Sequence, residues 1–226
     1  MRPFVLACFF GALIGTIGCG GASHSVKEGA KFTLKKGAFD PVNLKDFHFK
    51  FIEGDYFPVK EGSTWEYDVE LQINSMPVQK GTITKKAEGE EKINGKTYLK
   101  IVDVVTIDPE IIYVRNDSKD TYSFSKKHPE VGEQTYLPSR LMLGHEWTRV
   151  TDLGQAPCRL EDEEDIQIGD QVYKRCLKVK ENWTYIFSGT TDYYAPDIGL
   201  VKRIHQVRTI SGAFGSTTLS LKKYSR

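Results

Sequence analysis

Hydrophobic and polar residues alternate along most of the chain from residue 64 to the C-terminus. In the clearest stretch, 64–73, every second residue is apolar and the residues between are polar: Trp65, Tyr67, Val69, Leu71 and Ile73 share one face. A period of two predicts a half-buried antiparallel strand. Similar strand-like runs occupy 78–88, 96–106, 111–116, 120–125, 134–137, 146–151, 171–181, 184–194, 200–210 and 217–224. We therefore expect an all-β domain.

Turn signals separate these runs, and helical periodicity is absent from the rest of the pattern. Asn94-Gly95 predicts a tight turn between two strands. Residues 137–143 are expected to form one helical turn at most. The acidic run 161–165 predicts a solvated hairpin tip. The alternative is a Ca²⁺ site, but the run lacks the glycine spacing of an EF-hand loop.

One part of the sequence echoes another. YFP at 56–58, followed by GSTW at 62–65, is matched by YLP at 136–138, followed by GHEW at 144–147. The echo predicts two similar halves of about 80 residues, joined into one antiparallel, strongly curved sheet or barrel. The alternative is that strand starts simply favour glycine, aromatic residues and proline.

The N-terminus has the composition of an export signal. An apolar run, 4–17, follows Arg2, and about 14 residues are too few for a helix that crosses a bilayer. Gly18-Cys19 resembles the bacterial lipobox, in which the cysteine is lipidated and becomes the new N-terminus. The alternatives are cleavage after Ala22, which gives a secreted protein, and an uncleaved anchor. We expect a signal peptide at 1–18, a tether at 19–45 that is rich in Gly, Lys and Ser, and a β domain at 46–226.

Charge and composition limit the partners of the mature chain. Loss of Arg2 with the signal leaves 30 basic residues against 30 acidic ones. This neutral balance argues against sequence-independent binding of nucleic acid, and membrane attachment has to come from the acyl chains. The aromatic residues suffice to fill a sizeable interior. No cofactor is expected.

Cys158 and Cys176 are the two cysteines left for the folded domain. In an oxidising compartment an isolated pair predicts a disulfide, which would stabilise the fold by roughly 3 kcal/mol. The alternative is two buried free thiols. No histidine lies at ligand spacing from either cysteine, so we expect no metal site.

The chain carries no common catalytic motif, and its five histidines are scattered. We therefore expect no enzyme. The residues singled out are assigned structural roles, as strand ends, turns and plugs of the sheet. They are Pro58, Gly62, Trp65, Trp147, Pro196 and Gly199.

Two phrases, YFPVKEGSTWEY at 56–67 and YYAPDIGLVK at 193–202, resemble a class of uncharacterised bacterial envelope lipoproteins. Asp197 stands where the usual phrase has glycine. The resemblance implies a β-rich domain of unknown function and brings no catalytic residues.

Two functions are then open. The first is a non-catalytic interaction or assembly module that binds an envelope protein partner. The alternative is a carrier of an apolar ligand or lipid, for which a cavity above ~300 Å³ lined by apolar groups is expected. Gly20 directly after the lipidated cysteine predicts an outer-membrane location by analogy with the lipoprotein sorting rule.

Overall fold

The computed structural model describes residues 51–103, 111–117, 120–151, 154–183, 188–208 and 214–226. Cys19, the signal peptide and the tether lie outside these residues. The described residues belong to one compact unit, Phe47–Arg226. No helix among them has the length and hydropathy needed to cross a membrane.

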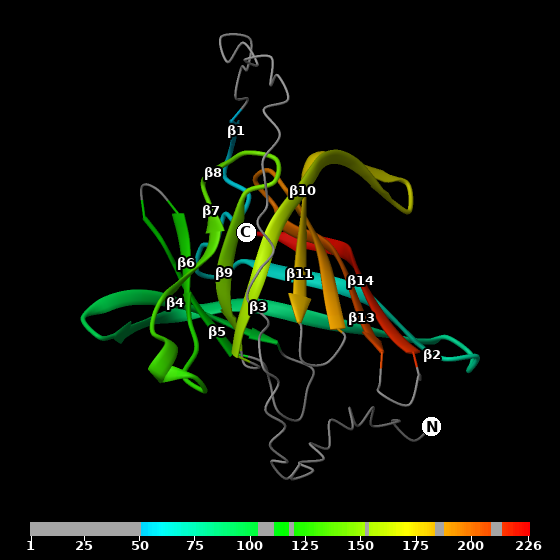
Figure 1. Cartoon of the computed structure of the whole chain (residues 1–226), viewed down its shortest axis with the longest axis horizontal. Helices are drawn as coiled ribbons and strands as arrows, with labels where there is room; N and C mark the ends of the chain where they lie inside the picture. Colours follow the sequence, from blue (N-terminus) through cyan, green and yellow to red (C-terminus); the bar gives the residue numbers. More distant parts are fainter. Residues whose placement is uncertain (1–50, 104–110, 118–119, 152–153, 184–187, 209–213) are drawn as a thin grey trace, which may run out of the picture. The chain divides into compact units, whose positions relative to one another are not determined.

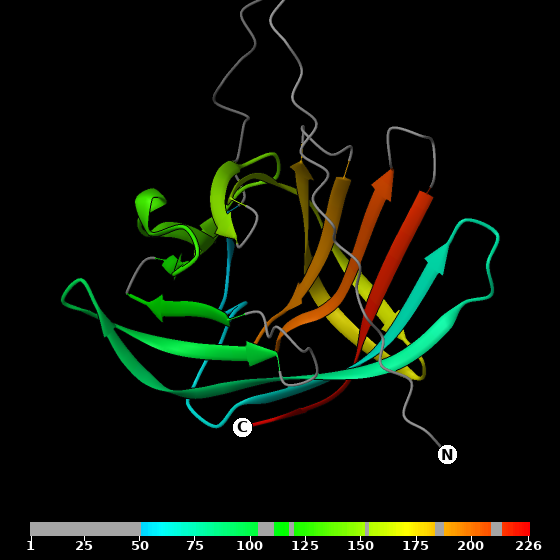
Figure 2. The same ribbon diagram turned by 90° about the horizontal axis from the view of Figure 1, so that it is seen from below.

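The unit is almost entirely β-structure, as the alternating pattern predicts. Twelve strands form one antiparallel sheet that is curved until it is nearly closed into a barrel, and β1 pairs separately with β8 (Figures 1 and 2). One 3₁₀ turn, η2, covers Pro129–Val131. The strands are β1 (Ile52–Glu53), β2 (Thr64–Ile73), β3 (Gln79–Ile93), β4 (Lys96–Asp103), β5 (Ile111–Asn116), β6 (Asp120–Phe124), β7 (Gln134–Pro138), β8 (Arg140–Leu141), β9 (Glu146–Thr151), β10 (Gly154–Ile168), β11 (Gln171–Trp183), β12 (Ser188–Ala195), β13 (Gly199–Arg208) and β14 (Phe214–Ser225).

The sheet consists of two meanders of six strands each, β2–β7 and β9–β14. Its order is β7-β6-β5-β4-β3-β2-β14-β13-β12-β11-β10-β9, so the two meanders are joined by the ladder between β2 and β14. The edge strands β7 and β9 lie beside each other without a ladder between them. The predicted division into two similar halves is confirmed at this level.

The echoed sequences also occupy equivalent positions. Gly62 donates to the carbonyl of Ala87 on β3 at 3.0 Å, and Gly144 donates to that of Leu160 on β10 at 2.8 Å. Both glycines have positive φ, 83° and 81°, which a residue with a Cβ adopts only at a cost. A bulge lies between Glu88 and Glu90 in β3 and between Leu160 and Asp162 in β10, and each of these strands has 15 residues. The segments that lead into β2 and β9, the first strands of the two meanders, therefore have similar backbone structure.

The core fills the concave face of the sheet. Trp65 and Tyr67 on β2 are buried with Leu221 on β14, and Leu177 and Tyr194 lie on the second meander. A smaller cluster of Tyr98, Tyr113 and Phe124 covers the other face of β4–β6. Ile73, at the end of β2, is 40% exposed because it lies at the hairpin tip, beyond the core.

The expected hairpin tip at 161–165 is wrong. These acidic residues lie within β10, which the sequence pattern did not predict, and their charges are balanced across the ladder by β11. Glu163 pairs with Arg175 at 2.7 Å, and Glu164 pairs with Lys178 at 3.0 Å. Among the described residues no group of three or more His, Cys, Asp or Glu side chains is arranged to hold a metal ion. The segment 137–143, for which at most one helical turn was expected, forms none and contributes to the end of β7 and to β8.

The predicted disulfide is wrong as well, because Cys158 and Cys176 are free, buried thiols. Cys158 lies opposite Glu181 in the β10–β11 ladder, and Cys176 lies opposite Glu164. Cys176 and Glu181 are five positions apart on β11, about 16 Å at the rise of a strand. That separation is far beyond the ~7 Å between Cα atoms that a disulfide spans. The long β10 displaces the two cysteines from each other.

Candidate functional site

A network of buried charged side chains lies on the concave face of the second meander. At its centre is Asp192 on β12, which accepts hydrogen bonds from Arg203 Nε and Nη2 at 2.7 and 2.9 Å. Arg149 Nη1 contributes a third at 3.2 Å, and the Tyr194 hydroxyl a fourth at 2.9 Å. The side chains of Arg149 and Asp192 are only 1% exposed. We call these four residues the Asp192 network.

Strand pairing brings the network together. Asp192 lies directly opposite Arg203 in the β12–β13 ladder, so both side chains point to the same face. Arg149 comes from β9, the edge strand three places from β12 in the sheet order, and reaches Asp192 because the sheet curls back on itself. Arg149 also lies 3.6 Å from Glu181. Two arginines and two carboxylates thus share the interior, and their charges cancel.

The same arginine bridges the gap between the edge strands. Arg149 Nε donates to the carbonyl of Tyr136 on β7 at 2.6 Å, and Trp147 Nε1 donates to the same oxygen at 3.2 Å. The guanidinium of Arg149 also lies 4.6 Å from the centre of the Tyr136 ring. Side chains of β9 therefore take the place of the missing ladder and connect the ends of the sheet.

Burial and charge act in opposite directions on Asp192. Burial favours its neutral form, but the two arginines, Arg203 more than Arg149, outweigh this effect and lower the pKa of Asp192 from 3.8 to about 2. Burial raises the pKa of the Tyr194 hydroxyl, which stays protonated and can donate to the carboxylate. The network is therefore ionised throughout the neutral and mildly acidic range.

The lowered pKa of Asp192 predicts a loss of stability in acid. A carboxylate with a lower pKa in the folded state stabilises the fold above its unfolded pKa, and this contribution disappears as the pH falls toward the folded value. We expect it to be lost between about pH 4 and pH 2 and to be on the order of 2 kcal/mol. Urea unfolding of the wild type and of Asp192→Asn across this window checks the prediction. Because Glu133 also has a lowered pKa of about 2, only the difference between the two curves is diagnostic, and parallel curves would contradict the assignment.

Next to the network, a histidine extends the polar wall of the interior. His205 Nδ1 lies 2.9 Å from the Thr190 hydroxyl, and Nε2 lies 3.4 Å from that of Ser188. Burial lowers the pKa of His205, and Arg203 adds to the effect. The contact of Ser188 with His205 lacks the orienting carboxylate of a catalytic triad, since Nδ1 faces a hydroxyl. The arrangement is suited to hydrogen bonding.

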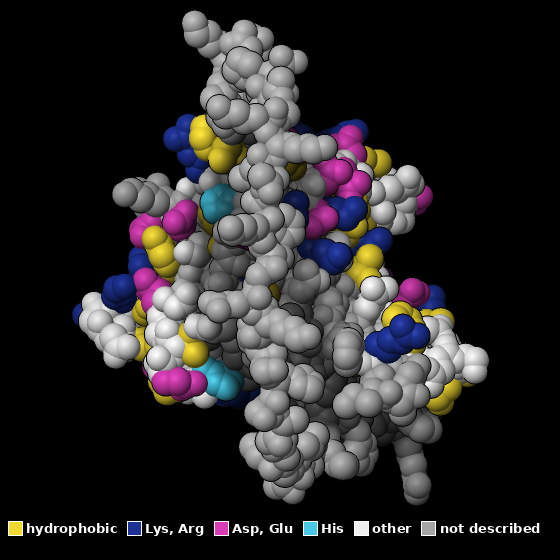
Figure 3. Space-filling view, viewed as in Figure 1, with side chains coloured by type: hydrophobic (Ala, Val, Ile, Leu, Met, Phe, Trp, Pro, Cys, Tyr) yellow, Lys and Arg dark blue, Asp and Glu magenta, His cyan; other side chains and the backbone are white. Residues whose placement is uncertain are grey.

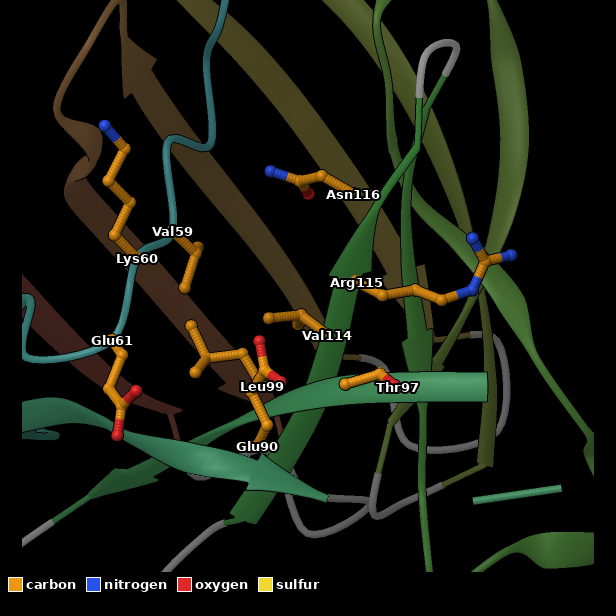
Figure 4. A pocket seen from close by; sticks show the side chains of 9 residues that line it. All are labelled: Val59, Lys60, Glu61, Glu90, Thr97, Leu99, Val114, Arg115 and Asn116. Atoms are coloured by element: carbon orange, nitrogen blue, oxygen red, sulfur yellow. The ribbon is translucent and has the colours of Figure 1, made fainter. Parts of the chain in front are cut away.

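A pocket of about 420 Å³ opens between the segment 59–61 and the first meander (Figure 4). Leu99 and Val114 form an apolar part of its wall, while Glu61 and Glu90 bring carboxylates and Asn116 an amide. Lys60, Val59, Thr97 and Arg115 complete the lining. Arg115 extends away from the space in Figure 4 and pairs with Glu133 at 2.5 Å. The pocket exceeds the volume expected for a carrier, but its lining is mixed rather than apolar.

The two phrases that carry the resemblance meet in space. Trp65 Nε1 donates to the carbonyl of Ile198 at 2.8 Å, and its ring stacks on Tyr224 at 5.5 Å. A Cβ added to Gly199 would lie 3.7 Å from the Trp65 indole and 3.9 Å from Pro58. Gly199 has a φ of +95°, so a substitution there would be strained by conformation before it met these neighbours.

The turn that contains Pro196 follows β12 directly and is closed by Ile198 donating to the carbonyl of Ala195 at 3.4 Å. Asp197, which replaces the glycine of the usual phrase, has a φ of 61°. It therefore adopts the left-handed conformation that favours glycine, and its amide donates to the carbonyl of Asp55 at 2.8 Å. Asp197 is thus held in this conformation by a backbone hydrogen bond.

The residues of the Asp192 network were not singled out from the sequence. A signal was present: the turn at 196–199 places Asp192 and Arg203 opposite each other, and alternation puts Asp192 on the same face as Tyr194. The approach of Arg149 depends on the closure of the sheet, for which no local pattern exists.

No protein-family model matches the chain, and no curated protein matches it either. Solved structures show a distant likeness. A protein from Bacteroides fragilis NCTC 9343, described as exported and with a YmcC-like fold, is 13% identical, covers 75% of this chain and 98% of its own, and has a TM-score of 0.46. A protein from Parabacteroides distasonis ATCC 8503, described as a lipoprotein, is 14% identical, covers 77% and 100%, and has a TM-score of 0.40. A DUF1329 family protein from Desulfovibrio piger ATCC 29098 has a TM-score of 0.24 at 12% identity and covers 72% of this chain and 85% of its own. At these scores the likeness carries no inference about activity or ligand.

Proposed function

We propose that the protein is a lipid-anchored lipoprotein of the bacterial cell envelope that acts without catalysis, as an interaction module. The sequence supports the anchor through the lipobox-like Gly18-Cys19 behind an apolar run. The observation that carries the second part is the set of large side chains buried on the concave face of the sheet. Where a carrier would hold an apolar ligand, Tyr67, Tyr194 and Leu177 pack together and the Asp192 network occupies the adjacent space.

The anchor is tested by replacing its acceptor. Cys19→Ala should abolish incorporation of labelled fatty acid and move the protein from the membrane fraction to the soluble fraction. The mass of the variant protein shows whether its signal peptide was cleaved, because an uncleaved signal would keep it in the membrane. For the wild type, separation of the two membranes on a density gradient should place the protein in the outer membrane. A wild type that carries no acyl label, or whose membrane association is unchanged in Cys19→Ala after cleavage, would rule out the anchor.

A carrier function is the second candidate, and the pocket of about 420 Å³ supports it. With Glu61 and Glu90 in the wall beside Leu99 and Val114, such a ligand would be amphipathic, with a polar or cationic group, rather than wholly apolar. Mass spectrometry of the protein purified from its host, first native and then after solvent extraction, separates the candidates. A stoichiometric small molecule supports the carrier, and its absence supports the interaction module.

A further inference from the structure

Four large apolar side chains are exposed together at one end of the sheet, at the tip of the β2–β3 hairpin and the start of β14. Ile73 is 40% exposed, Met76 52%, Val78 46% and Phe214 41%. Figure 2 shows the hairpin projecting from the body, and Figure 3 shows yellow side chains among white ones at this end. We call these four residues the apolar tip.

The tip is held in place by hydrogen bonds and not by burial. Asn74 donates its amide to the carbonyl of Phe214 at 2.8 Å and accepts from the Phe214 amide through its side chain at 2.7 Å. Met76 donates to the carbonyl of Ile73 at 2.9 Å, and Gln72 Nε2 donates to that of Met76 at 2.7 Å. The apolar side chains are thus presented to solvent from a defined backbone.

Charge is absent from the tip although 27% of the chain is charged. Residues 71–79 and 214–221 include no Asp, Glu, Lys or Arg. The nearest charges along the hairpin are Lys80 and Glu70, which pair with each other at 2.8 Å. Arg208, opposite Phe214 in the ladder, is exposed and adds one cation beside the tip. An apolar, uncharged tip bordered by a cation suits the boundary between acyl chains and anionic headgroups.

We infer that the apolar tip is a second, shallow contact with the lipid bilayer, an inference that rests on the proposed lipid anchor. Between Cys19 and the first described residue, Phe51, the chain can extend to about 110 Å. An anchor on so long a segment brings the domain near the bilayer without fixing which side faces it. Orientation then has to come from the folded body, and the apolar tip has the chemistry to provide it.

The size of the tip favours a bilayer over a second copy of the chain. Its four side chains expose roughly 350 Å² together, taking about 200 Å² for each complete side chain. Stable protein interfaces bury about 800 Å² on each partner. A bilayer requires no matching surface and accepts a small convex tip.

Full-length, acylated protein in vesicles of phosphatidylethanolamine and phosphatidylglycerol with brominated acyl chains provides the test. Met76→Trp places a fluorophore at the tip, and Val172→Trp, on the β10–β11 hairpin and 41% exposed, is the matched control. After subtraction of the wild-type signal, we expect the emission of the tryptophan at 76 to shift to the blue and fall at least about twofold, and that at 172 to stay unchanged.

The outcomes separate this inference from the anchor. Vesicle attachment with an acyl label but no quenching at 76, or equal quenching at 76 and 172, would overturn the membrane contact and leave the anchor in place. A blue shift that rises with protein concentration and is insensitive to bromine would mean that a second copy covers the tip, which also overturns the inference. A wild type without acyl label defeats the anchor alone, and quenching at 76 by added vesicles still supports the contact.

Discussion

Replacing Arg149 with methionine is expected to lower the free energy of unfolding by about 3–5 kcal/mol. Methionine keeps much of the apolar volume but removes the positive charge next to Glu181 and part of the charge that balances Asp192. It also removes the hydrogen bond to the carbonyl of Tyr136, which connects β9 to β7. An uncompensated charge in a dry interior costs far more than an exposed ion pair contributes. Urea unfolding followed by circular dichroism at pH 7 measures the loss.

Arg159→Met is the matched control. Arg159 lies on the neighbouring strand β10, is 55% exposed, and meets Glu146 and Glu161 only at 3.9 and 3.8 Å. Its replacement should change stability by less than about 1 kcal/mol. Similar losses for the two variants would mean that the Asp192 network does not stabilise the barrel. Should Arg149→Met fail to fold, Arg149→Lys, which keeps the charge but loses the fork of donors, serves as the milder variant.

Trp65→Ala should lower the free energy of unfolding by about 3–5 kcal/mol because packing in the core is lost. The indole is 4% exposed, stacks on Tyr224, and covers Gly199 where segments 56–67 and 193–202 meet. Loss of the ring therefore leaves a cavity between the start of the first meander and the end of the second. Thermal and urea unfolding beside the wild type measure the effect.

Trp65→Phe separates packing from hydrogen bonding. Phenylalanine keeps an aromatic ring but cannot donate to the carbonyl of Ile198, so a loss of about 1–2 kcal/mol is expected. If Trp65→Ala kept the unfolding midpoint of the wild type, Trp65 would have no role in the core.

Local alternation carried most of the information about the fold. The predicted runs 111–116 and 146–151 coincide with β5 and β9. On the apolar face of β2, Trp65 and Tyr67 are buried as the alternation predicts. The echo of 56–65 in 136–147 also corresponds to equivalent backbone hydrogen bonds at Gly62 and Gly144. These features depend on near neighbours in the sequence, which is why the pattern reveals them.

The failures occurred where a partner strand decides the outcome. The acidic residues 161–165 look like a loop in the sequence alone. In the structure they form a strand because Arg175 and Lys178 on β11 neutralise part of their charge. The disulfide was predicted from cysteine count and compartment, but the register of a strand that was not predicted keeps Cys158 away from Cys176. The Asp192 network depends on strand pairing and on closure of the sheet. The β12–β13 hairpin pairs Asp192 with Arg203, and closure of the sheet adds Arg149.

The ladder between β2 and β14 determines the order in which the sheet can be completed. Each meander can form from neighbouring strands as its own residues become available, but β2 pairs with β14, the last of the described strands. Contacts between such distant segments raise the contact order and slow folding. A chain that is truncated directly before Phe214 would lack all of β14 and leave the facing edges of β2 and β13 unpaired. Exposed strand edges promote aggregation, so a truncated chain should be lost to proteolysis or aggregation before it could function.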